Sequence, residues 1–370
     1  MDLNTARALG LELAGKLPWQ EIADSPTIRY YTDWSKFEGF KPLRDVTPQK
    51  HPPGPCEIVV INGRLAGWGV CNGVETALAN DIFRQVEINS KILALHASAL
   101  SEAVYVGVKS RVEPLVIKLI ADLQRAHVAS HLLLDVDKSA SGSIVVYVES
   151  GVDTMHTAVV EGDVRGPVEY VLVSRGGGPQ YVHSTLSIRS SIYGRPFVVG
   201  GVMNAVREEY ILGEETYAEV VGLELGLGES RIDHVVSLVN NAPRGRSFAK
   251  LYAVAADRSF VAQRAVGRIT QRGVGSESSV DGVAYIAGDE AVVNTQPVIL
   301  VETGDVAGAR HSAADAALDE EKEFFLRARG IKKEDISRLL IASLIDQYLS
   351  TLSDRARDFV NSVFKSVGMF

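Results

Sequence analysis

Short apolar runs rich in β-branched residues fill the middle of the chain, and Gly, Asn, Asp, Pro or Ser ends each run. Runs of this length and composition, bounded by turn-forming residues, predict β-strands. The predicted strands are 58–61, 104–108, 143–148, 168–173, 181–188, 197–202, 235–239, 250–255, 260–269, 283–286 and 298–301. Residues 143–301 show almost no helical period, so we expect a mainly β core. A sandwich, a barrel and a β-solenoid all fit this spacing, and no strict repeat chooses among them.

Residues 114–127 fit two kinds of structure. Pro114 at a first helical position, followed by Leu115, Leu119 and Leu123, favours a helix. The run Leu-Val-Ile-Lys-Leu-Ile within the same segment favours a strand. The pattern alone leaves both structures open.

The N-terminal region has a different pattern from the middle. Residues 2–17 predict a helix, with leucines along one side, Asn4 or Thr5 as the cap and Pro18 as the end. An aromatic stretch follows at 19–37, and we expect it to pack against the next domain rather than to form a ligand box. The proline-rich segment 42–55 is typical of a linker.

The C-terminal region predicts three helices. The first has Asp319 as its N-cap and Gly330 at the left-handed position where a helix stops. In the second, residues 336–352, apolar residues recur on one face, and Asp335 is the expected cap. The third, residues 353–367, is also apolar on one face, so we expect it to pack on the second.

Composition and charge exclude several classes of protein. At 370 residues, the chain is long enough for two or three structural units, and 46% apolar content is ample for a core. The formal net charge of −8 gives no electrostatic footprint for nucleic acid. No apolar run reaches the roughly 20 residues that a membrane helix needs, and the N-terminal segment does not resemble a secretion signal. We therefore expect a cytoplasmic protein with no nucleic-acid or membrane partner.

The chain has two cysteines, Cys56 and Cys71. Two cysteines cannot build a disulfide framework, which agrees with a reducing compartment. They form no CxxC motif and have no nearby histidine pair, so the spacing of a metal site is not met. We expect Cys71 to be a buried small hydrophobe, and Cys56 to lie exposed in the linker, where a functional thiol is the less favoured alternative.

Two other motifs invite a chemical interpretation. The glycine-rich stretch at 175–179 lacks the Gly-Lys-Ser/Thr ending of a phosphate-binding loop, so it predicts a turn. No Walker motif occurs in the sequence, so we do not expect this chain to hydrolyse ATP. Asp233 and His234 are adjacent, and adjacent residues of a strand point to opposite faces. We therefore expect one of them to be buried and the other exposed, not an acid–base pair.

The segment from Asp305 to Ile331 carries the most specific pattern. It reads Asp305-Val306, then His311-Ser-Ala-Ala, then Leu318-Asp-Glu-Glu, then Phe324-Phe-Leu-Arg-Ala-Arg-Gly-Ile331. This order and spacing resembles the closing signature of the SufB/SufD family, the scaffold subunits of the SUF iron–sulfur cluster assembly complex. Four residues separate Val306 from His311, one more than is usual in the family.

Further segments extend the resemblance over roughly residues 90–352, with a weaker match at the N-terminus. Leu95-His96-Ala97, followed by the strand at 104–108 and by Pro114, is similar to one family segment. Ile232-Asp233-His234, followed by Pro243 and Ser247, is similar to another, although Asn240 stands where the family has a second histidine.

The resemblance implies a fold. The family core is a right-handed parallel β-helix, a solenoid, which we expect at 57–311. An N-terminal helical region and linker would occupy 1–56, and a C-terminal helical domain 312–370. On the family pattern, residues 114–127 are strand rather than helix.

The resemblance also implies a site. In SufD-type members the histidine at the position of His311 is implicated in cluster assembly, and neutral imidazole is a suitable ligand for iron. The alternative for His311 is a purely structural role at the end of the solenoid. The cysteine and the glutamate of SufB-type subunits fall near Asp281 and at Ser312 in this chain. Because thiolate is the ligand that holds iron–sulfur clusters, we expect a SufD-type partner with a transient cluster at the subunit interface.

The expected partners are a SufB-type paralogue, or a second copy of this chain, and a SufC-type ABC ATPase. The resemblance places ATPase docking on the C-terminal helices, at Phe324, Phe325, Arg329, Gly330, Ile336, Leu340 and Leu344. The simpler role for the second helix is to close the open end of the solenoid, whose last strand would otherwise expose an unpaired edge. Under this interpretation the chain is not an enzyme by itself.

Two other classes of protein remain open. A β-solenoid enzyme acting on carbohydrate needs carboxylates or basic residues clustered along one face, often with calcium, and no such array is visible. A self-associating scaffold without cluster chemistry fits the missing cysteine. A bound iron–sulfur chromophore separates this second class from a SufD-type subunit.

Overall fold

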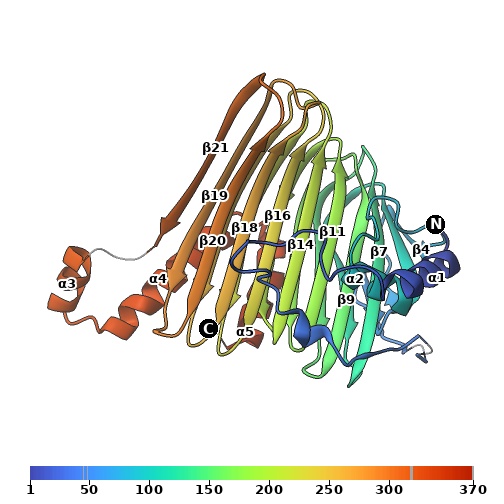
Figure 1. Ribbon diagram of the computed structural model, residues 1–370, viewed down its shortest axis with the longest axis horizontal. Coiled ribbons are helices and arrows are strands. Elements are labelled where there is room, and N and C mark those ends of the chain that lie inside the picture. The colour runs from blue at the N-terminus through green and yellow to red at the C-terminus, as the bar shows by residue number, and fades with distance from the viewer. Residues whose placement is uncertain (45, 48, 317–319, 369–370) are drawn as a thin grey trace.

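Most of the chain forms a parallel β-solenoid of about seven turns, with helices at both ends (Figure 1). The computed structural model describes residues 1–44, 46, 47, 49–316 and 320–368. Each turn of the solenoid contributes one strand, or two short ones, to each of two sheets. The mainly β core and the solenoid are therefore confirmed.

The ten-stranded sheet, here sheet A, contains β1 (Lys41–Pro42), β4 (Val74–Leu78), β5 (Leu100–Val108), β7 (Ala126–Val136), β9 (Thr154–Val164), β11 (Pro179–Ile188), β14 (Met203–Leu212), β16 (Arg231–Asn240), β18 (Phe260–Ile269) and β20 (Val292–Val301). The eleven-stranded sheet, here sheet B, contains β2 (Glu57–Ile61), β3 (Arg64–Trp68), β6 (Arg111–Ala121), β8 (Ser141–Ser150), β10 (Val168–Gly176), β12 (Ser191–Gly194), β13 (Phe197–Gly200), β15 (Tyr217–Gly226), β17 (Arg246–Ala255), β19 (Ser276–Ile286) and β21 (Val306–Asp315). Residues 114–127 lie in β6 and at the start of β7, so the strand interpretation of this segment is confirmed.

The two ends of the solenoid are built differently. Antiparallel pairs, β2 with β3 and β4 with β5, finish the N-terminal end. At the other end, β20 pairs with β18 and β21 pairs with β19, and neither has a second neighbour in the part of the chain that the structure describes. These two strands are therefore the open edge of the solenoid (Figure 1).

The register explains why no repeat is visible in the sequence. Ser184 lies opposite Glu208 in the next turn, whereas Ala265 lies opposite Pro297. Equivalent positions are therefore separated by different numbers of residues, because the corners between the strands differ in length. The glycine-rich stretch at 175–179 is one of these corners, between β10 and β11, as predicted.

The N-terminal region packs on the outer face of sheet A. It contains α1 (Leu3–Leu13), the 3-10 helix η1 (Trp34–Phe37) and α2 (Lys91–Ala99). The sequence pattern did not predict α2. Trp34 stacks on Trp19 at 5.4 Å and lies 6.1 Å from the ring of Tyr181 on β11. The aromatic stretch therefore packs on the core, as expected.

The ends of α1 differ from the prediction. Asp2 is its N-cap, because the Asp2 carboxylate accepts the backbone N–H groups of Asn4 and Thr5. The expected caps, Asn4 and Thr5, therefore lie two and three residues after the cap, inside the first turn of the helix. The helix ends at Leu13, well before Pro18, so proline does not set its end.

The C-terminal helices are α3 (Glu320–Ala328), α4 (Lys333–Leu349) and α5 (Asp354–Ser366). The helices α4 and α5 cover the outer face of sheet B, where Phe364 lies 4.5 Å from the ring of Phe197. The suggestion that α4 closes the open end of the solenoid is therefore wrong, since β20 and β21 remain edge strands. In Figure 1, α3 stands apart from the strands.

The predicted caps of these helices had mixed outcomes. The N-cap of α4 is Lys332, which makes no side-chain capping bond, so the expected cap at Asp335 is wrong. Gly330 has φ of +86°, the left-handed conformation predicted for the residue that ends α3. The predicted cap of α3, Asp319, lies outside the described residues.

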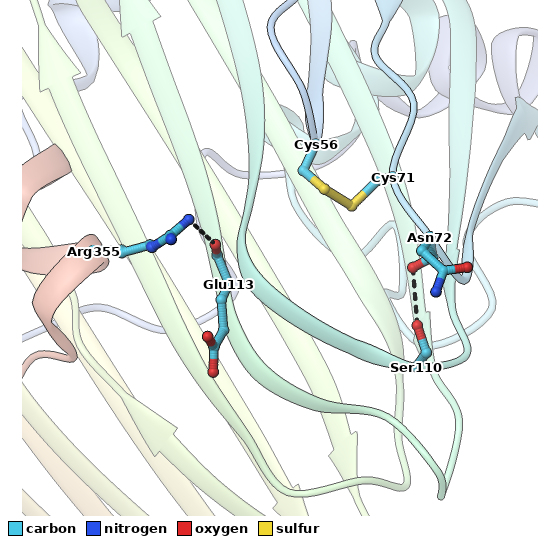
Figure 2. Close-up of a disulfide and its surroundings, with 6 residues drawn as sticks. All are labelled: Cys56, Cys71, Asn72, Ser110, Glu113 and Arg355. Carbon is cyan, nitrogen blue, oxygen red and sulfur yellow. Dashed lines mark hydrogen bonds between the residues drawn. A yellow bond between two sulfur atoms is a disulfide. The ribbon is translucent and has the colours of Figure 1, made fainter.

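Cys56 and Cys71 form a disulfide, contrary to the prediction of one buried and one exposed thiol (Figure 2). The β2–β3 hairpin causes the pairing: Asn62 and Gly63 turn the chain at positive φ, and the N–H of Cys56 then bonds to the Val70 carbonyl. The sequence analysis did not predict β3, so the approach of the two cysteines was not foreseen. Figure 2 also shows α5 tied to β6 nearby, where Arg355 donates to the carbonyl of Glu113.

Among the described helices, none is both long and apolar enough to span a membrane.

Candidate functional site

His311 lies on β21, the edge strand of sheet B, and its position depends on a β-bulge. Val306 pairs with Ser276, but the next pair joins Gly308 to Glu277, so Ala307 has no partner residue. The bulge absorbs the extra residue between Val306 and His311, and His311 falls opposite Val280. Paired residues point to the same face of a sheet, and Val280 belongs to the core between the sheets. His311 therefore faces the space between sheets A and B at the open edge.

The contact that His311 makes sets its tautomer. Its Nδ1 lies 2.9 Å from the backbone carbonyl oxygen of Pro297 on β20. A carbonyl oxygen can only accept, so Nδ1 carries the proton and, in the neutral ring, the lone pair is on Nε2. The side chain is exposed, and Nε2 has no hydrogen-bond partner among the described residues. A histidine whose second nitrogen is held by a carbonyl in this way is prepared to act as a metal ligand or a base.

Asp281 and Ser312 are the positions at which the resemblance places the cysteine and the glutamate of SufB-type subunits. They lie close to His311 but on the opposite face of the sheet. Asp281 and Ser312 are opposite each other in the β19–β21 pairing, and the Ser312 hydroxyl donates to Asp281 Oδ1 at 2.6 Å. Arg310 is on this face too, where its Nε donates to the Ser279 hydroxyl at 2.8 Å. The guanidinium therefore points away from the imidazole of His311.

The predicted docking residues separate into two groups. Phe324 and Phe325 on α3 are exposed, at 73% and 51%, and the Arg329 guanidinium lies 3.7 Å above the Phe325 ring. Ile336 and Leu344 on α4 are buried, Leu344 in the packing between α4 and sheet B. These two side chains cannot contact a partner unless α4 moves. Leu340 is partly buried against the same packing, and Gly330 is exposed.

His234 is enclosed inside the solenoid, between two carboxylates of the preceding turn. Its Nδ1 lies 2.5 Å from Glu224 Oε1 and its Nε2 3.1 Å from Glu208 Oε2, while Tyr210 donates to Glu208. Burial alone would lower the pKa of His234, but the hydrogen bonds to Glu208 and Glu224 outweigh it and raise the pKa to about 9. Burial raises the pKa of Glu224, and the bond from His234 opposes this only partly.

Asp233 points out of the solenoid, as strand geometry requires, but it is fully buried. Its carboxylate binds the guanidinium groups of Arg207 and Arg264 and accepts from the Thr32 hydroxyl. Burial would raise the pKa of Asp233, but the two arginines and Thr32 lower it to about 2. The expectation that one residue of the pair is exposed is therefore wrong, because the N-terminal region covers this face of sheet A.

A chain of buried histidines between α2 and sheet A was missed in the sequence. His96 Nε2 lies 3.1 Å from His131 Nδ1, and His131 Nε2 lies 3.1 Å from Glu161 Oε1. Burial and the neighbouring histidines hold the pKa of His96 well below its usual value. The available signal was weak: His127 and His131 are four residues apart, which places both on one face of a strand.

No group of three or more His, Cys, Asp or Glu side chains within the described ranges is arranged to hold a metal ion. The described hydrogen bond of His311 joins it to the Pro297 carbonyl and not to the networks around His234 and His96. Of the three, His311 is the one that an outside molecule can reach.

Comparison with known proteins agrees with this architecture. Residues 119–344 match the family model described as SUF system FeS cluster assembly, SufBD core domain. The chain is 22% identical to an iron–sulfur cluster assembly SufBD family protein of Pyrococcus horikoshii, covering 71% of this chain and 61% of that protein. It is 21% identical to the iron–sulfur cluster assembly protein SufD of Bacillus subtilis, covering 71% and 63%.

A shorter match joins 15% of this chain to 14% of a SufBD family protein of Mycobacterium leprae, at 35% identity. The chain spans less than two thirds of the length of the Pyrococcus and Bacillus relatives. The family model, by contrast, covers more than half of this chain. The chain therefore belongs to the SufBD family of iron–sulfur cluster assembly proteins.

Proposed function

We propose that this chain is a SufD-type scaffold subunit of an iron–sulfur cluster assembly complex, and that it works through its open edge. The observation that carries the proposal is the state of His311. An exposed imidazole with Nδ1–H bound to the Pro297 carbonyl presents the Nε2 lone pair at the last strand of the solenoid.

The edge strands supply the surface for a partner. The backbone N–H and C=O groups on the free side of β20 and β21 can pair with a strand of another chain, as an unpaired edge generally can. Apolar side chains on β20 are also open to solvent, with Val292 and Leu300 each 48% exposed. The partner is a SufB-type paralogue or a second copy of this chain, and His311 would lie in the resulting interface.

The chemistry at the edge follows from the donor type. A neutral imidazole donates to iron through Nε2, whereas iron–sulfur clusters are held mainly by thiolates. Asp281 and Ser312 offer only oxygen donors, and both are engaged with each other. We therefore assign the thiolate ligands to a SufB-type partner, since both cysteines of this chain, and so of a second copy, are paired in the Cys56–Cys71 disulfide. The cluster is cargo that assembles between the subunits and leaves.

The ATPase partner would bind at the C-terminal helices. Phe324 and Phe325 of α3 and Leu339 of α4 are exposed apolar side chains in this region. Three large apolar side chains on neighbouring helices are suited to a protein contact. The chain itself would act as a scaffold, and ATP hydrolysis would belong to the partner.

The test is co-expression with the SufB-type paralogue and the ABC-type ATPase of the same organism, followed by size-exclusion chromatography with light scattering. We expect one complex that contains all three chains. His311→Ala should leave the complex intact and abolish the visible absorbance of the reconstituted cluster. Arg310→Ala is the matched control, because Arg310 is adjacent but faces the other side of the sheet, and it should retain the cluster. If the chain elutes alone while the other two associate, the scaffold assignment is wrong.

A further inference from the structure

The N-terminal segment from Gln20 to Trp34, here the strap, crosses the outer face of sheet A as far as its last strand. In Figure 1 it is the dark blue segment in front of the strands around β18. At one end of the strap Trp34 lies against Tyr181 of β11. Three residues before Trp34, Tyr31 contacts β20, the edge strand. The strap thus connects the packed middle of sheet A to its edge.

Two anchors, one hydrogen bond and one ion pair, fix the strap on β16 and β18. The Thr32 hydroxyl donates to Asp233 Oδ2 at 2.5 Å, and the Asp24 carboxylate binds the Arg264 guanidinium. Asp24 Oδ2 also accepts the backbone N–H of Tyr31 at 2.8 Å. Asp233 and Asp24 are both buried, so these contacts are shielded from solvent. The backbone of Tyr31 is therefore held on both sides.

The side chain of Tyr31 reaches from these anchors to β20. Its ring stacks on Phe260 at 6.4 Å and is only 4% exposed. Its hydroxyl accepts from Gln296 Nε2 at 2.5 Å and from Asn294 Nδ2 at 3.3 Å. Gln296 and Asn294 are alternate residues of β20, so the hydroxyl binds two side chains on the outer face of the edge strand.

This contact is one residue away from the candidate site. Gln296 precedes Pro297, whose carbonyl accepts the Nδ1–H of His311. Within the described chain β20 has a neighbouring strand on one side only, so its side-chain contacts carry more of its restraint than those of an inner strand. The strap is therefore placed to control where the Pro297 carbonyl lies.

We propose that Tyr31 is a positioning residue for the edge: its hydroxyl holds β20 in place, which keeps the Pro297 carbonyl on His311 Nδ1 and the lone pair on Nε2. The importance of this role for cluster assembly rests on the proposed function. The geometric effect does not, because it concerns contacts within one chain. A substitution in the N-terminal region would thus change the hydrogen bond between the Pro297 carbonyl and His311, although the two regions are far apart in the sequence.

The test compares Tyr31→Phe with Tyr30→Phe. The Tyr31 substitution removes only the hydroxyl and keeps the stacking on Phe260. Tyr30 is on the same strap, and its hydroxyl makes no hydrogen bond within the described structure, so it is the matched control. The first readout is hydrogen–deuterium exchange of the peptide that covers β20. We expect exchange about five- to tenfold faster in Tyr31→Phe, the effect of losing the short neutral hydrogen bond from Gln296 and the longer, weaker one from Asn294. We expect no change in Tyr30→Phe.

The second readout is the tautomer of His311, read from the side-chain nitrogen shifts of 15N-histidine-labelled protein and assigned with His311→Gln. We expect wild type and Tyr30→Phe to show the Nδ1–H form, and Tyr31→Phe to gain the Nε2–H form. Gln296→Leu should reproduce the change, and the double variant should add nothing further because both act through one contact.

Unchanged exchange in Tyr31→Phe would overturn the positioning of β20. Faster exchange with an unchanged His311 tautomer would overturn the link to the site. Both readouts use the isolated chain, so they remain informative if the three-chain complex or its cluster fails to form. A failure of the proposed function is thereby kept apart from a failure of this inference.

Discussion

The interior network around His234 makes stability depend on pH in a direction unusual for a buried histidine. We consider the substitution His234→Gln, which removes the imidazolium cation and leaves the carboxylates of Glu208 and Glu224 inside the solenoid without it. In the native chain the imidazolium donates to both carboxylates, and all three side chains are fully buried. Removing one partner of a buried ion pair costs about 3–5 kcal/mol, because the remaining charge is left uncompensated.

The pH dependence follows from the same contacts. The pKa of His234 is about 9 in the folded chain and 6.5 in the unfolded one. The folded state therefore holds the proton more tightly, and the stabilisation is complete below pH 6.5. It is lost as pH rises from 6.5 to 9, by about 1.4 kcal/mol per pH unit and about 3 kcal/mol in total. Below pH 7, His96, His127, His156 and His183 oppose this trend, because burial lowers the pKa of each and the unfolded state then binds more protons. Above pH 7 these four side chains are neutral in both states, so the slope there belongs to His234.

The assay is urea unfolding followed by circular dichroism at pH 7, 8 and 9. Wild type should lose stability steadily over this range, while His234→Gln should be less stable at pH 7 and nearly independent of pH above it. His156→Gln is the matched control: His156 is equally buried but bonds to Ser130 and a backbone carbonyl, so it should keep the alkaline slope. A flat wild-type profile between pH 7 and 9, or an unchanged slope in His234→Gln, would refute the reasoning.

Three further predictions concern the ends of the fold. The double substitution Cys56→Ser/Cys71→Ser should lower the free energy of unfolding by about 3 kcal/mol, since the disulfide closes a loop with a sequence separation of 15; unfolding of wild type under reducing conditions should show the same loss. Phe364→Ala should lower stability by about 3–5 kcal/mol because Phe364 is fully buried between α5 and sheet B; in thermal unfolding the exposed Phe325→Ala should change little, and equal effects would contradict this packing. Deleting Ala307 should leave the His311 tautomer and the thermal midpoint unchanged, because the deletion removes the extra residue together with the bulge and so keeps His311 opposite Val280. A shifted 15N-histidine signal would show that this register is not kept.

The sequence predicted the strands best where both faces are apolar. The runs in β8 and β10 were recognised because parallel strands covered on both sides are rich in β-branched residues. By contrast β14 was missed, since its Arg207, Glu208 and Glu209 interrupt the pattern. Glu208 is tolerated inside the solenoid because His234 and Tyr210 bind it, and these contacts come from a different turn and from the same strand.

The candidate site shows the same division between local and long-range information. The motif around His311 could be recognised from residue order alone, and so could the adjacent positions Asp281 and Ser312. The carbonyl of Pro297 could not, because it belongs to the other sheet and meets His311 only after both strands have closed the last turn. The disulfide was not predicted for a similar reason, since the β2–β3 hairpin had to be known before its two cysteines could be paired.

The position of His311 is best understood against the other histidines of the fold. Five of the other histidines, namely His96, His131, His156, His183 and His234, have both ring nitrogens in hydrogen bonds, so each serves to satisfy polar groups within the chain. His311 has one nitrogen bound and the other open, and it is on the last strand, where the next turn would otherwise have covered it. A solenoid buries the polar groups of each turn with the turn that follows, so the final turn is the natural place for a side chain that must meet another molecule. The carbonyl that holds Nδ1 lies on the neighbouring edge strand, and an incoming strand would approach both at once. Under the proposed function, pairing of the edge would bring a partner strand to the Pro297 carbonyl and to the nitrogen donor of His311 in a single event, so that a cluster could assemble between the two subunits.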